Sequence, residues 1–474
     1  MFELAAIILY FSVVLTIGIL SSYSQRMNAA GFIIGNRSLN YWLTALAAHA
    51  SDMSNWLFMA YPAMIFTVGL NKTSIALGLL ICMYLNWQFI APKIRVATEK
   101  LNSLTFFSYL GSRFGDESGA LRIVTTLICF VFYTIYISAG LVGLGLLIES
   151  LFHIPYSIGI LIGILVALPY VIVGGYLTLA WIDLFQGFFL MAIIIFVPSF
   201  LIGKVGGWEG IKEFAHAGHI SLRILPELSF KSLSATLLTM LGWGLGYFGQ
   251  PAIITKFMGI KHTSEMSKSK LLGMSWMSIS LAAATMVGLV GIPFFQGKLD
   301  NPEMVFIELV KQSFHPFFIG LILCAVFAAS INVMCSQILV VCSSLAEDIY
   351  KRAFRNQASS KEELLVSRLG VLVVALIAFL IAFYKISSIY SLVLYAWSGL
   401  GAAFGPLLIF SLYSKKSNKS IAWAGILSGS IVSAIWPWIN SLLSFDLDPI
   451  IAGFTLSFLS IWITARIQKR KLSI

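Results

Sequence analysis

The sequence predicts an all-α polytopic membrane protein with about thirteen transmembrane helices. Three observations support this class. Of the 474 residues, 59% are hydrophobic and only 11% are charged, whereas a soluble protein carries roughly 25% charged residues. The mean hydropathy is +0.91. The apolar residues form long blocks, and ~20 such residues are enough for a helix to cross a bilayer. A soluble multi-domain enzyme, a disordered chain and a disulfide-rich secreted protein are therefore excluded.

The apolar runs between polar breaks predict the spans in chain order. Their approximate limits are residues 3–22, 41–69, 73–92, 118–151, 156–178, 184–204, 231–258, 270–296, 314–349, 365–384, 388–413, 420–438 and 447–466. The first run is too long for the apolar core of a signal peptide, and Glu3 rather than a basic residue precedes it, so we expect a retained helix. The largest connections, 93–117, 205–230 and 350–364, are too short to be domains.

The net charge of +11 suggests a membrane topology rather than a nucleic-acid partner, because Lys and Arg collect in cytoplasmic loops. An external N-terminus with thirteen spans places 8 of the 31 Lys and Arg outside and the other 23 inside. The outside residues are Lys72, Lys204, Lys212, Arg223, Lys231, Lys298, Lys311 and Lys385, and the inside ones include Arg26, Arg37, Lys93, Arg95, Lys351, Arg352, Lys415, Lys416, Lys469 and Arg470. This split predicts an N-out, C-in topology.

Asp52 is the clearest ionisable residue at membrane depth, and such residues are functional by default. Ser51, Ser54 and Asn55 beside it favour a break in the helix, since short polar side chains compete for backbone groups. Asp52 is either a structural cap in a kinked helix or a cation or proton site at the break. His49 lies three residues earlier, on nearly the same face of a continuous helix. It is either a packing residue or half of a His–Asp proton relay.

The seventh span contains a second break. Residues 242–251 read GWGLGYFGQP, and this density of glycine followed by proline disfavours a straight helix. Trp243 and Tyr247 are four residues apart and share a face, as either lipid-facing aromatics or a substrate-contacting pair. The broken spans are five apart and so cross in opposite senses, which predicts an inverted repeat of five plus five helices. In such folds the substrate and ion sites lie at the breaks.

These stretches resemble the sodium:solute symporter family, and within it the proline-transporting bacterial branch. The resemblance extends over nearly the whole length, from residues 35–39 (GNRSL) to about Pro406. Its most specific parts are 50–54 (ASDMS), 241–251, 173–176 (VGGY) with Asp183 and Gln186, and 395–397 (YAW). It implies the leucine-transporter-like fold in a single membrane domain, 1–474. The expected parts are one extra helix and loop (1–40), two repeats (41–204 and 231–413), and two final helices with a basic tail (414–474).

The resemblance also implies roles for individual residues. The positions that match the proline site are Tyr136, Trp243, Tyr247 and Pro251, with Ser54 beside them. The positions that match the sodium pathway are Ala50, Met53 and Ala329 through their carbonyls, with Asp52 and Asn332. Arg37 and Asp183 match coupling or gating positions on the cytoplasmic side, and His49 joins them as the candidate proton carrier.

The sequence departs from the family pattern at the sodium site. Two hydroxyl positions of the ninth span correspond to Asn332 and Val333. Asn332 still offers an amide oxygen, but Val333 offers no ligand for a hard cation. His49, Asn55 and Ala47 depart as well. Three alternatives follow: sodium coupling, which we expect, proton coupling through Asp52 and His49, or uncoupled exchange.

The expected function is a secondary symporter, not an enzyme, that imports proline or a related small amino acid across the bacterial cytoplasmic membrane. No organic cofactor, nucleic acid or obligatory protein partner is expected; the partners are the solute, the coupling ion and the lipid bilayer. A membrane sensor that has kept the fold without transport is the alternative class. No nucleotide-binding loop is present in the sequence, which argues against an ATP-driven pump.

Overall fold

The computed structural model describes residues 2–23, 28–225, 228–444 and 447–471, and these are almost wholly helical. The α-helices are α1 (Phe2–Tyr23), α2 (Ala29–Ile34), α3 (Tyr41–Ala50), α4 (Tyr61–Val68), α5 (Thr73–Leu85), α6 (Ala91–Lys100), α7 (Phe106–Phe114), α8 (Ala120–Phe152), α9 (Tyr156–Leu201), α10 (Gly207–Ala217), α11 (Phe230–Gly244), α12 (Pro251–Met258), α13 (Met266–Phe294), α14 (Val305–Ser313), α15 (Pro316–Ser344), α16 (Ser360–Phe383), α17 (Ile389–Tyr413), α18 (Lys419–Leu443) and α19 (Pro449–Lys471).

Short 3₁₀ or π-helical segments join or interrupt these helices. They are η1 (Gly35–Arg37), η2 (Trp56–Ala60), η3 (Leu70–Lys72), η4 (Asn86–Ile90), η5 (Ile202–Val205), η6 (Leu245–Gly249), η7 (Thr263–Glu265), η8 (Pro302–Met304) and η9 (Leu345–Phe354). Two isolated backbone bridges, Leu39 with Ile260 and Gly69 with Ser221, are the only β pairing in the described ranges.

Ten helices within the described residues are long and apolar enough to cross a membrane, which confirms a polytopic all-α protein. They are Phe2–Ser21, Leu70–Lys100, Ala120–Phe152, Gly174–Val205, Thr263–Phe294, Pro316–Phe354, Ser360–Phe383, Ile389–Tyr413, Lys419–Leu443 and Pro449–Gln468. The three other predicted spans, 41–69, 156–178 and 231–258, fall on shorter or broken helices. The count of thirteen therefore stays a prediction.

Helix breaks explain why those three spans are short. The first lies at residues 51–55, between α3 and η2, and the second at η6 and Gln250, between α11 and α12. The third is Gly175 inside α9, where φ is +60° and ψ is −171°, a backbone conformation that glycine adopts without strain. The loop expected at 179–183 is wrong, because the chain bends at Gly175 and is helical through 179–183.

The long connections contain helices that the sequence analysis did not predict. The stretch 93–117 holds the end of α6 and all of α7, and 205–230 holds α10. Apolar faces cause this: α7 and α10 each turn buried residues toward the bundle, among them Phe107 and Ile211. Arg26 lies outside the described residues, and Lys469 and Arg470 fall within α19.

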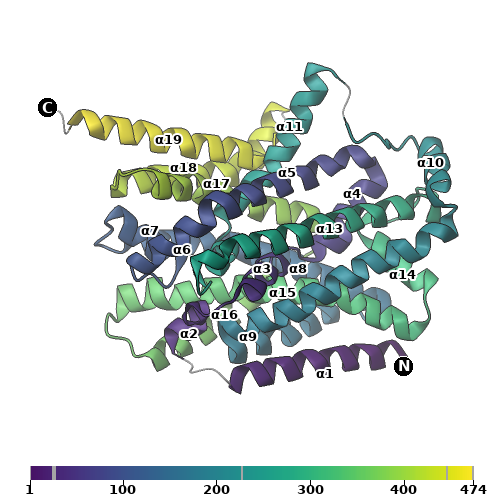
Figure 1. Ribbon diagram of the computed structural model, residues 1–474, viewed down its shortest axis with the longest axis horizontal. Coiled ribbons are helices and arrows are strands. Elements are labelled where there is room, and N and C mark those ends of the chain that lie inside the picture. The colour runs from purple at the N-terminus through teal and green to yellow at the C-terminus, as the bar shows by residue number, and fades with distance from the viewer. Residues whose placement is uncertain (1, 24–27, 226–227, 445–446, 472–474) are drawn as a thin grey trace.

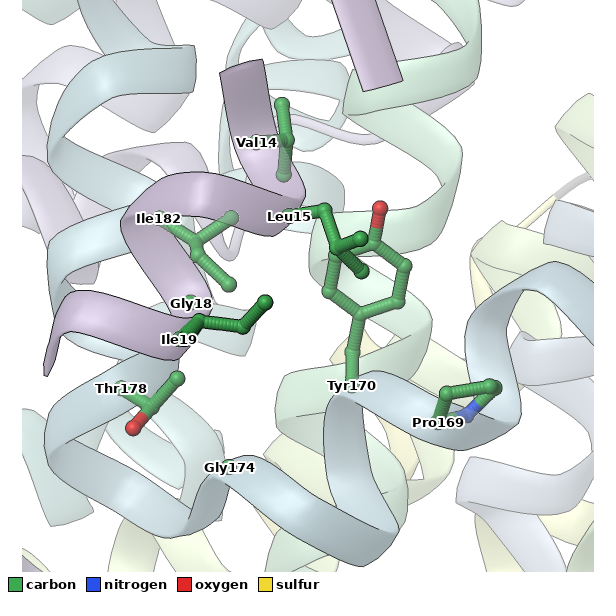
Figure 2. Close-up of a pocket in the computed structure, with 9 residues that line it drawn as sticks. All are labelled: Val14, Leu15, Gly18, Ile19, Pro169, Tyr170, Gly174, Thr178 and Ile182. Carbon is green, nitrogen blue, oxygen red and sulfur yellow. The ribbon is translucent and has the colours of Figure 1, made fainter. Parts of the chain in front are cut away.

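The helices form one bundle in which most run side by side (Figure 1). The described ends of α1 and α19 lie at opposite ends of the bundle, which agrees with an odd number of crossings (Figure 1). α1 packs on α9 and α15 at one edge, and α18 and α19 pack together at the other. Beside the bend of α9, Gly18 of α1 and Gly174 line an apolar cavity of about 130 Å³ (Figure 2).

Candidate transport site

The first break follows directly from its polar residues. The Ser51 hydroxyl donates to the Ala47 carbonyl, and the backbone N–H groups of Asp52 and Met53 both bond back to the His49 carbonyl, at 3.2 and 3.0 Å. The chain then resumes as the π-helical segment η2, and such segments often occur at functional sites. Because α3 ends at Ala50, Asp52 lies beyond the helix, and the helical face predicted for His49 and Asp52 is wrong.

The second break has a packing cause that glycine flexibility alone does not reveal. A Cβ on Gly246 would lie 1.8 Å from Nε1 of Trp397, and one on Gly249 would lie 2.6 Å from the Leu400 carbonyl oxygen. The glycines therefore let η6 lie directly against α17. Gln250 is extended, with φ −84° and ψ +106°, and Pro251 begins α12 at a position that proline favours.

A small cavity lies between the two breaks. It is lined by Asp52, Met53, Trp56, Leu79, Tyr136, Trp243, Tyr247, Val393 and Trp397. Its volume is about 10 Å³, which leaves room for about one water molecule. An amino acid would therefore have to move the side chains that line this cavity. Three predicted substrate residues, Tyr136, Trp243 and Tyr247, line it, whereas Ser54 and Pro251 are buried and do not line it.

The aromatic side chains of this cavity form one connected group. The ring centroid of Trp243 lies 5.0 Å from Trp56 and 5.4 Å from Tyr390. Tyr247 meets Trp397 edge to face at 5.1 Å, and Trp397 Nε1 donates to the Trp243 carbonyl at 2.8 Å. We call Trp56, Trp243, Tyr247 and Trp397 the aromatic cage. It joins η2, α11, η6 and α17, so a movement of these elements relative to one another changes the shape of the cage.

Asp52 and Tyr247 connect the two breaks directly. The Tyr247 hydroxyl donates to Oδ2 of Asp52 at 2.5 Å, and both side chains are buried. This hydrogen bond links a candidate ion residue on the first break to a candidate substrate residue on the second, 195 residues away. A change in the charge or position of the Asp52 carboxylate therefore acts directly on Tyr247, which belongs to the aromatic cage.

The other candidate cation ligands lie deep in the bundle. Ala50, Met53, Ala329 and Asn332 are all buried. Ala50 ends α3, and Ala329 and Asn332 lie on α15, which contacts α3. Nδ2 of Asn332 has no hydrogen-bond partner among the described residues. No cluster of three or more His, Cys, Asp or Glu side chains that could hold a metal occurs in the described part of the chain.

Asp183 is held by a partner that the sequence did not identify. Its Oδ2 lies 3.0 Å from Nζ of Lys256, and both side chains are almost fully buried, at 1% and 3% exposed. The Lys256 ammonium also lies 5.0 Å from the ring centre of Tyr176. This ion pair joins the second half of α9 to α12. The sequence suggested that Asp52 is the chief charged residue at membrane depth. The buried pair of Asp183 and Lys256 shows that there are others.

Arg37 closes one end of the bundle. Its guanidinium donates to the Met258 carbonyl at 2.8 Å, the Ser103 carbonyl at 2.9 Å and the Thr98 hydroxyl at 3.2 Å. Burial, and next the neighbouring Arg95, lower the pKa of Arg37 to about 10. The predicted gating residue thus ties the end of α12 to the connection between α6 and α7.

His49 is enclosed by aromatic rings rather than placed against Asp52. Its Nε2 accepts from Trp87 Nε1 at 3.2 Å, and its ring lies 6.1 Å from both Trp87 and Trp276. Its Nδ1 has no partner within the described ranges. These are the contacts expected of a packing residue.

Tyr390 contacts the cage through Trp243, and Glu303 holds the segment that carries Tyr390. The Glu303 carboxylate accepts from the backbone N–H groups of Ile389 and Tyr390, at 3.3 and 3.0 Å, and so caps the start of α17. The Tyr390 hydroxyl accepts from Trp243 Nε1 at 3.4 Å. Burial raises the pKa of Glu303, and the two N–H groups act in the opposite direction.

Sequence reasoning missed four of these side chains as site residues: Trp56, Trp397, Lys256 and Glu303. Three carried a usable signal. Trp56 directly follows the first break, and Lys256 is a charge inside the predicted span 231–258. Trp397 ends the YAW stretch that contributes to the family resemblance. Glu303 acts only through contacts with a distant segment.

Known proteins share the sequence pattern and the fold of this chain. Residues 32–429 match the model of the Sodium:solute symporter family. The chain belongs to the sodium:solute symporter family. Its members are membrane transporters rather than enzymes. Among similar proteins of this family, the high-affinity proline transporter PutP of Bacillus subtilis is 38% identical over 93% of each chain. The sodium/proline symporter of Staphylococcus aureus is 36% identical over 98% of this chain and 92% of that protein.

Solved structures of other transporters have the same fold as this chain. A Na⁺-coupled sialic acid symporter in an outward-open state superimposes with a TM-score of 0.82 at 18% identity, covering 98% of each chain. MhsT bound to L-phenylalanine superimposes with a TM-score of 0.57 at 12% identity, covering 89% of this chain and 97% of that one. The predicted leucine-transporter-like fold class is confirmed; the limits of the two repeats stay a prediction.

Proposed function

We propose that this chain is a sodium-coupled symporter that imports proline, with its N-terminus outside and its C-terminus in the cytoplasm. The observation that carries the proposal is the aromatic cage between two helix breaks, linked by the bond from Tyr247 to Asp52. The names of its relatives, a proline transporter and a sodium/proline symporter, support the substrate and the ion. The excess of Lys and Arg on the cytoplasmic side supports the orientation.

The cage suits a small imino acid for physical reasons. The flat faces of Trp and Tyr can pack on both sides of an apolar ring. The carboxylate and ammonium groups of the zwitterion also need polar partners, and the backbone at the two breaks can supply them. α12 begins beside the cage and presents the positive end of its dipole, which suits a carboxylate. α3 ends at Ala50 and presents its negative end, which suits a cation.

Sodium is proposed to bind near the end of α3, with the carbonyls of Ala50, Met53 and Ala329 and the amide oxygen of Asn332 as ligands. Carbonyl and amide oxygens are suitable ligands for a hard cation. The packed environment of His49 argues against a His–Asp relay, because its side chain bonds to Trp87. Proton coupling through Asp52 alone remains the second candidate, since Asp52 is a buried carboxylate with one hydrogen-bond donor.

Uptake of labelled proline into proteoliposomes tests the substrate. We expect saturable uptake that excess unlabelled proline and its ring analogues suppress. Trp243→Leu should raise the half-saturating proline concentration about 30-fold, since removing an anchoring Trp costs about 2 kcal/mol. Trp181→Leu is the matched control, because Trp181 is 41% exposed and lies outside the cage. If proline analogues do not compete, or if the two variants behave alike, the substrate assignment is wrong.

A further inference from the structure

A larger cavity lies away from the cage, between the start of α5, residues 221–225 and α11. Its volume is about 480 Å³, and its lining includes Lys72, Ser74, Arg223, Thr236 and Thr239. Of the described residues that line it, none is acidic. The cavity ends where α5 and α11 touch, since a Cβ on Gly78 would lie 2.2 Å from the Met240 carbonyl oxygen.

The two cations in this cavity are available to a ligand. Neither Lys72 nor Arg223 forms an ion pair within the described part of the chain. Cationic side chains that converge on one space without a carboxylate favour an anion. A guanidinium and an ammonium together match the oxygens of a phosphate group.

The surface beside this cavity is strongly apolar. On the α11 side, Leu225, Leu228 and Phe230 are 78%, 94% and 90% exposed, and Leu233 and Leu237 continue along the helix at 47% and 55%. On the α5 side, Leu77 and Ile81 are 44% and 50% exposed. In Figure 1 the start of α11 projects from the bundle at the top of the view. In a membrane protein, exposed apolar side chains along spanning segments, here Leu233 and Leu237 of α11 and Leu77 and Ile81 of α5, face hydrocarbon.

We propose that this cavity is a binding site for the headgroup of an anionic phospholipid. Lys72 and Arg223 hold the phosphate, and the acyl chains lie along Leu233 and Leu237 of α11 and Leu77 and Ile81 of α5. A soluble anion would be held by the two cations but would make no use of the apolar flank. The combination of a cationic cavity with exposed apolar side chains on both flanking helices therefore favours a lipid.

The site has a mechanical consequence for transport. Thr239 lines the lipid cavity and Trp243, one helical turn further along α11, lines the aromatic cage. Likewise on α5, Ser74 lines the lipid cavity, and Leu79 lines the small cavity between the two breaks. A lipid that bridges α5 and α11 stabilises their contact at Gly78 and Met240, and so restrains the helix that carries Trp243.

The test is a lipid-retention measurement on the full-length protein. Purified protein is equilibrated with mixed phosphatidylglycerol and phosphatidylcholine, and bound lipids are counted by native mass spectrometry. Each Lys or Arg near an anionic lipid contributes about 1 kcal/mol, so Lys72→Gln with Arg223→Gln should lower the phosphatidylglycerol preference about 30-fold. The control, Lys298→Gln with Lys385→Gln, removes two exposed cations elsewhere and should leave the preference unchanged.

Three outcomes would overturn the proposal. The preference could survive in the Lys72 and Arg223 double variant, or it could fall equally in both double variants, which would show only general surface charge. In the third, millimolar inorganic phosphate displaces phosphatidylglycerol, so that the site is one for a free anion. A retained thermal unfolding temperature in the double variant separates loss of the lipid from loss of the fold.

Discussion

The hydrogen bond between Tyr247 and Asp52 should carry the coupling between ion and substrate. Tyr247→Phe removes the hydroxyl that donates to Asp52 at 2.5 Å and leaves the ring, which meets Trp397 at 5.1 Å. The volume of the cage is thus nearly unchanged. The perturbation is confined to the link between the two breaks.

The size of the effect follows from the chemistry of the bond. A hydrogen bond to a charged group contributes about 1.5–3 kcal/mol, which corresponds to roughly 10- to 150-fold in affinity. We therefore expect sodium to raise proline affinity less in Tyr247→Phe than in the wild type, by at least about tenfold. By reciprocity, proline should lose the same factor in its effect on sodium affinity.

The assay is proline binding to the purified protein, with and without saturating sodium, for Tyr247→Phe, Asp52→Asn and the double variant. The double variant should be little worse than either single variant, because both remove the same bond. The control is Tyr109→Phe, which removes a buried hydroxyl bonded to Ser411 at 2.9 Å, away from the cage. Penalties that add to within about 0.5 kcal/mol, or an unchanged sodium effect in Tyr247→Phe, would refute the reasoning.

Three further predictions follow from contacts around the site. Lys256→Met should destabilise the protein by about 3–5 kcal/mol, because it leaves Asp183 buried without its partner; thermal unfolding should recover when Asp183→Asn is added, and no recovery would contradict the pairing. Gly246→Ala should abolish uptake, since its Cβ would overlap Trp397, whereas Gly203→Ala, with nothing within 4 Å, should transport normally; equal uptake by the two would disprove the close-packing argument. Glu303 has a raised pKa in the folded state, so the folded protein binds its proton more tightly than the unfolded chain, and stability from this group falls as pH rises above about 4.5. The unfolding temperature of the wild type minus that of Glu303→Gln should therefore decrease as pH rises above about 4.5. A difference that stays constant with pH would contradict this prediction.

The breaks in the predicted spans 41–69 and 231–258 could be predicted because each leaves a local signal in the sequence. The close packing of η6 on α17 and the bend at Gly175 could not. Ser51, Asp52, Ser54 and Asn55 end a helix through their own side chains, and the glycine-rich stretch before Pro251 carries its own signal. The aromatic residues Trp243 and Tyr247 could be assigned to one face by spacing alone. These local rules placed two of the four cage residues at the second break and missed Trp56 and Trp397.

Long-range contacts could not be predicted in this way. Lys256 and Asp183 are 73 residues apart, and no pattern along the chain states that they pair. Glu303 meets the start of α17 from 87 residues away. His49 shows the opposite failure: its spacing from Asp52 suggested a pair, but α3 ends between them and the ring turns to Trp87.

The most direct test of sodium–proline symport uses one gradient to drive the other. Proteoliposomes receive equal sodium on both sides with a ²²Na⁺ tracer, and an inward proline gradient is then imposed. We expect the proline gradient to drive net ²²Na⁺ entry, and Tyr247→Phe to weaken it. Proline entry that acidifies the vesicle lumen without moving ²²Na⁺ would contradict sodium coupling and identify the proton as the coupled ion.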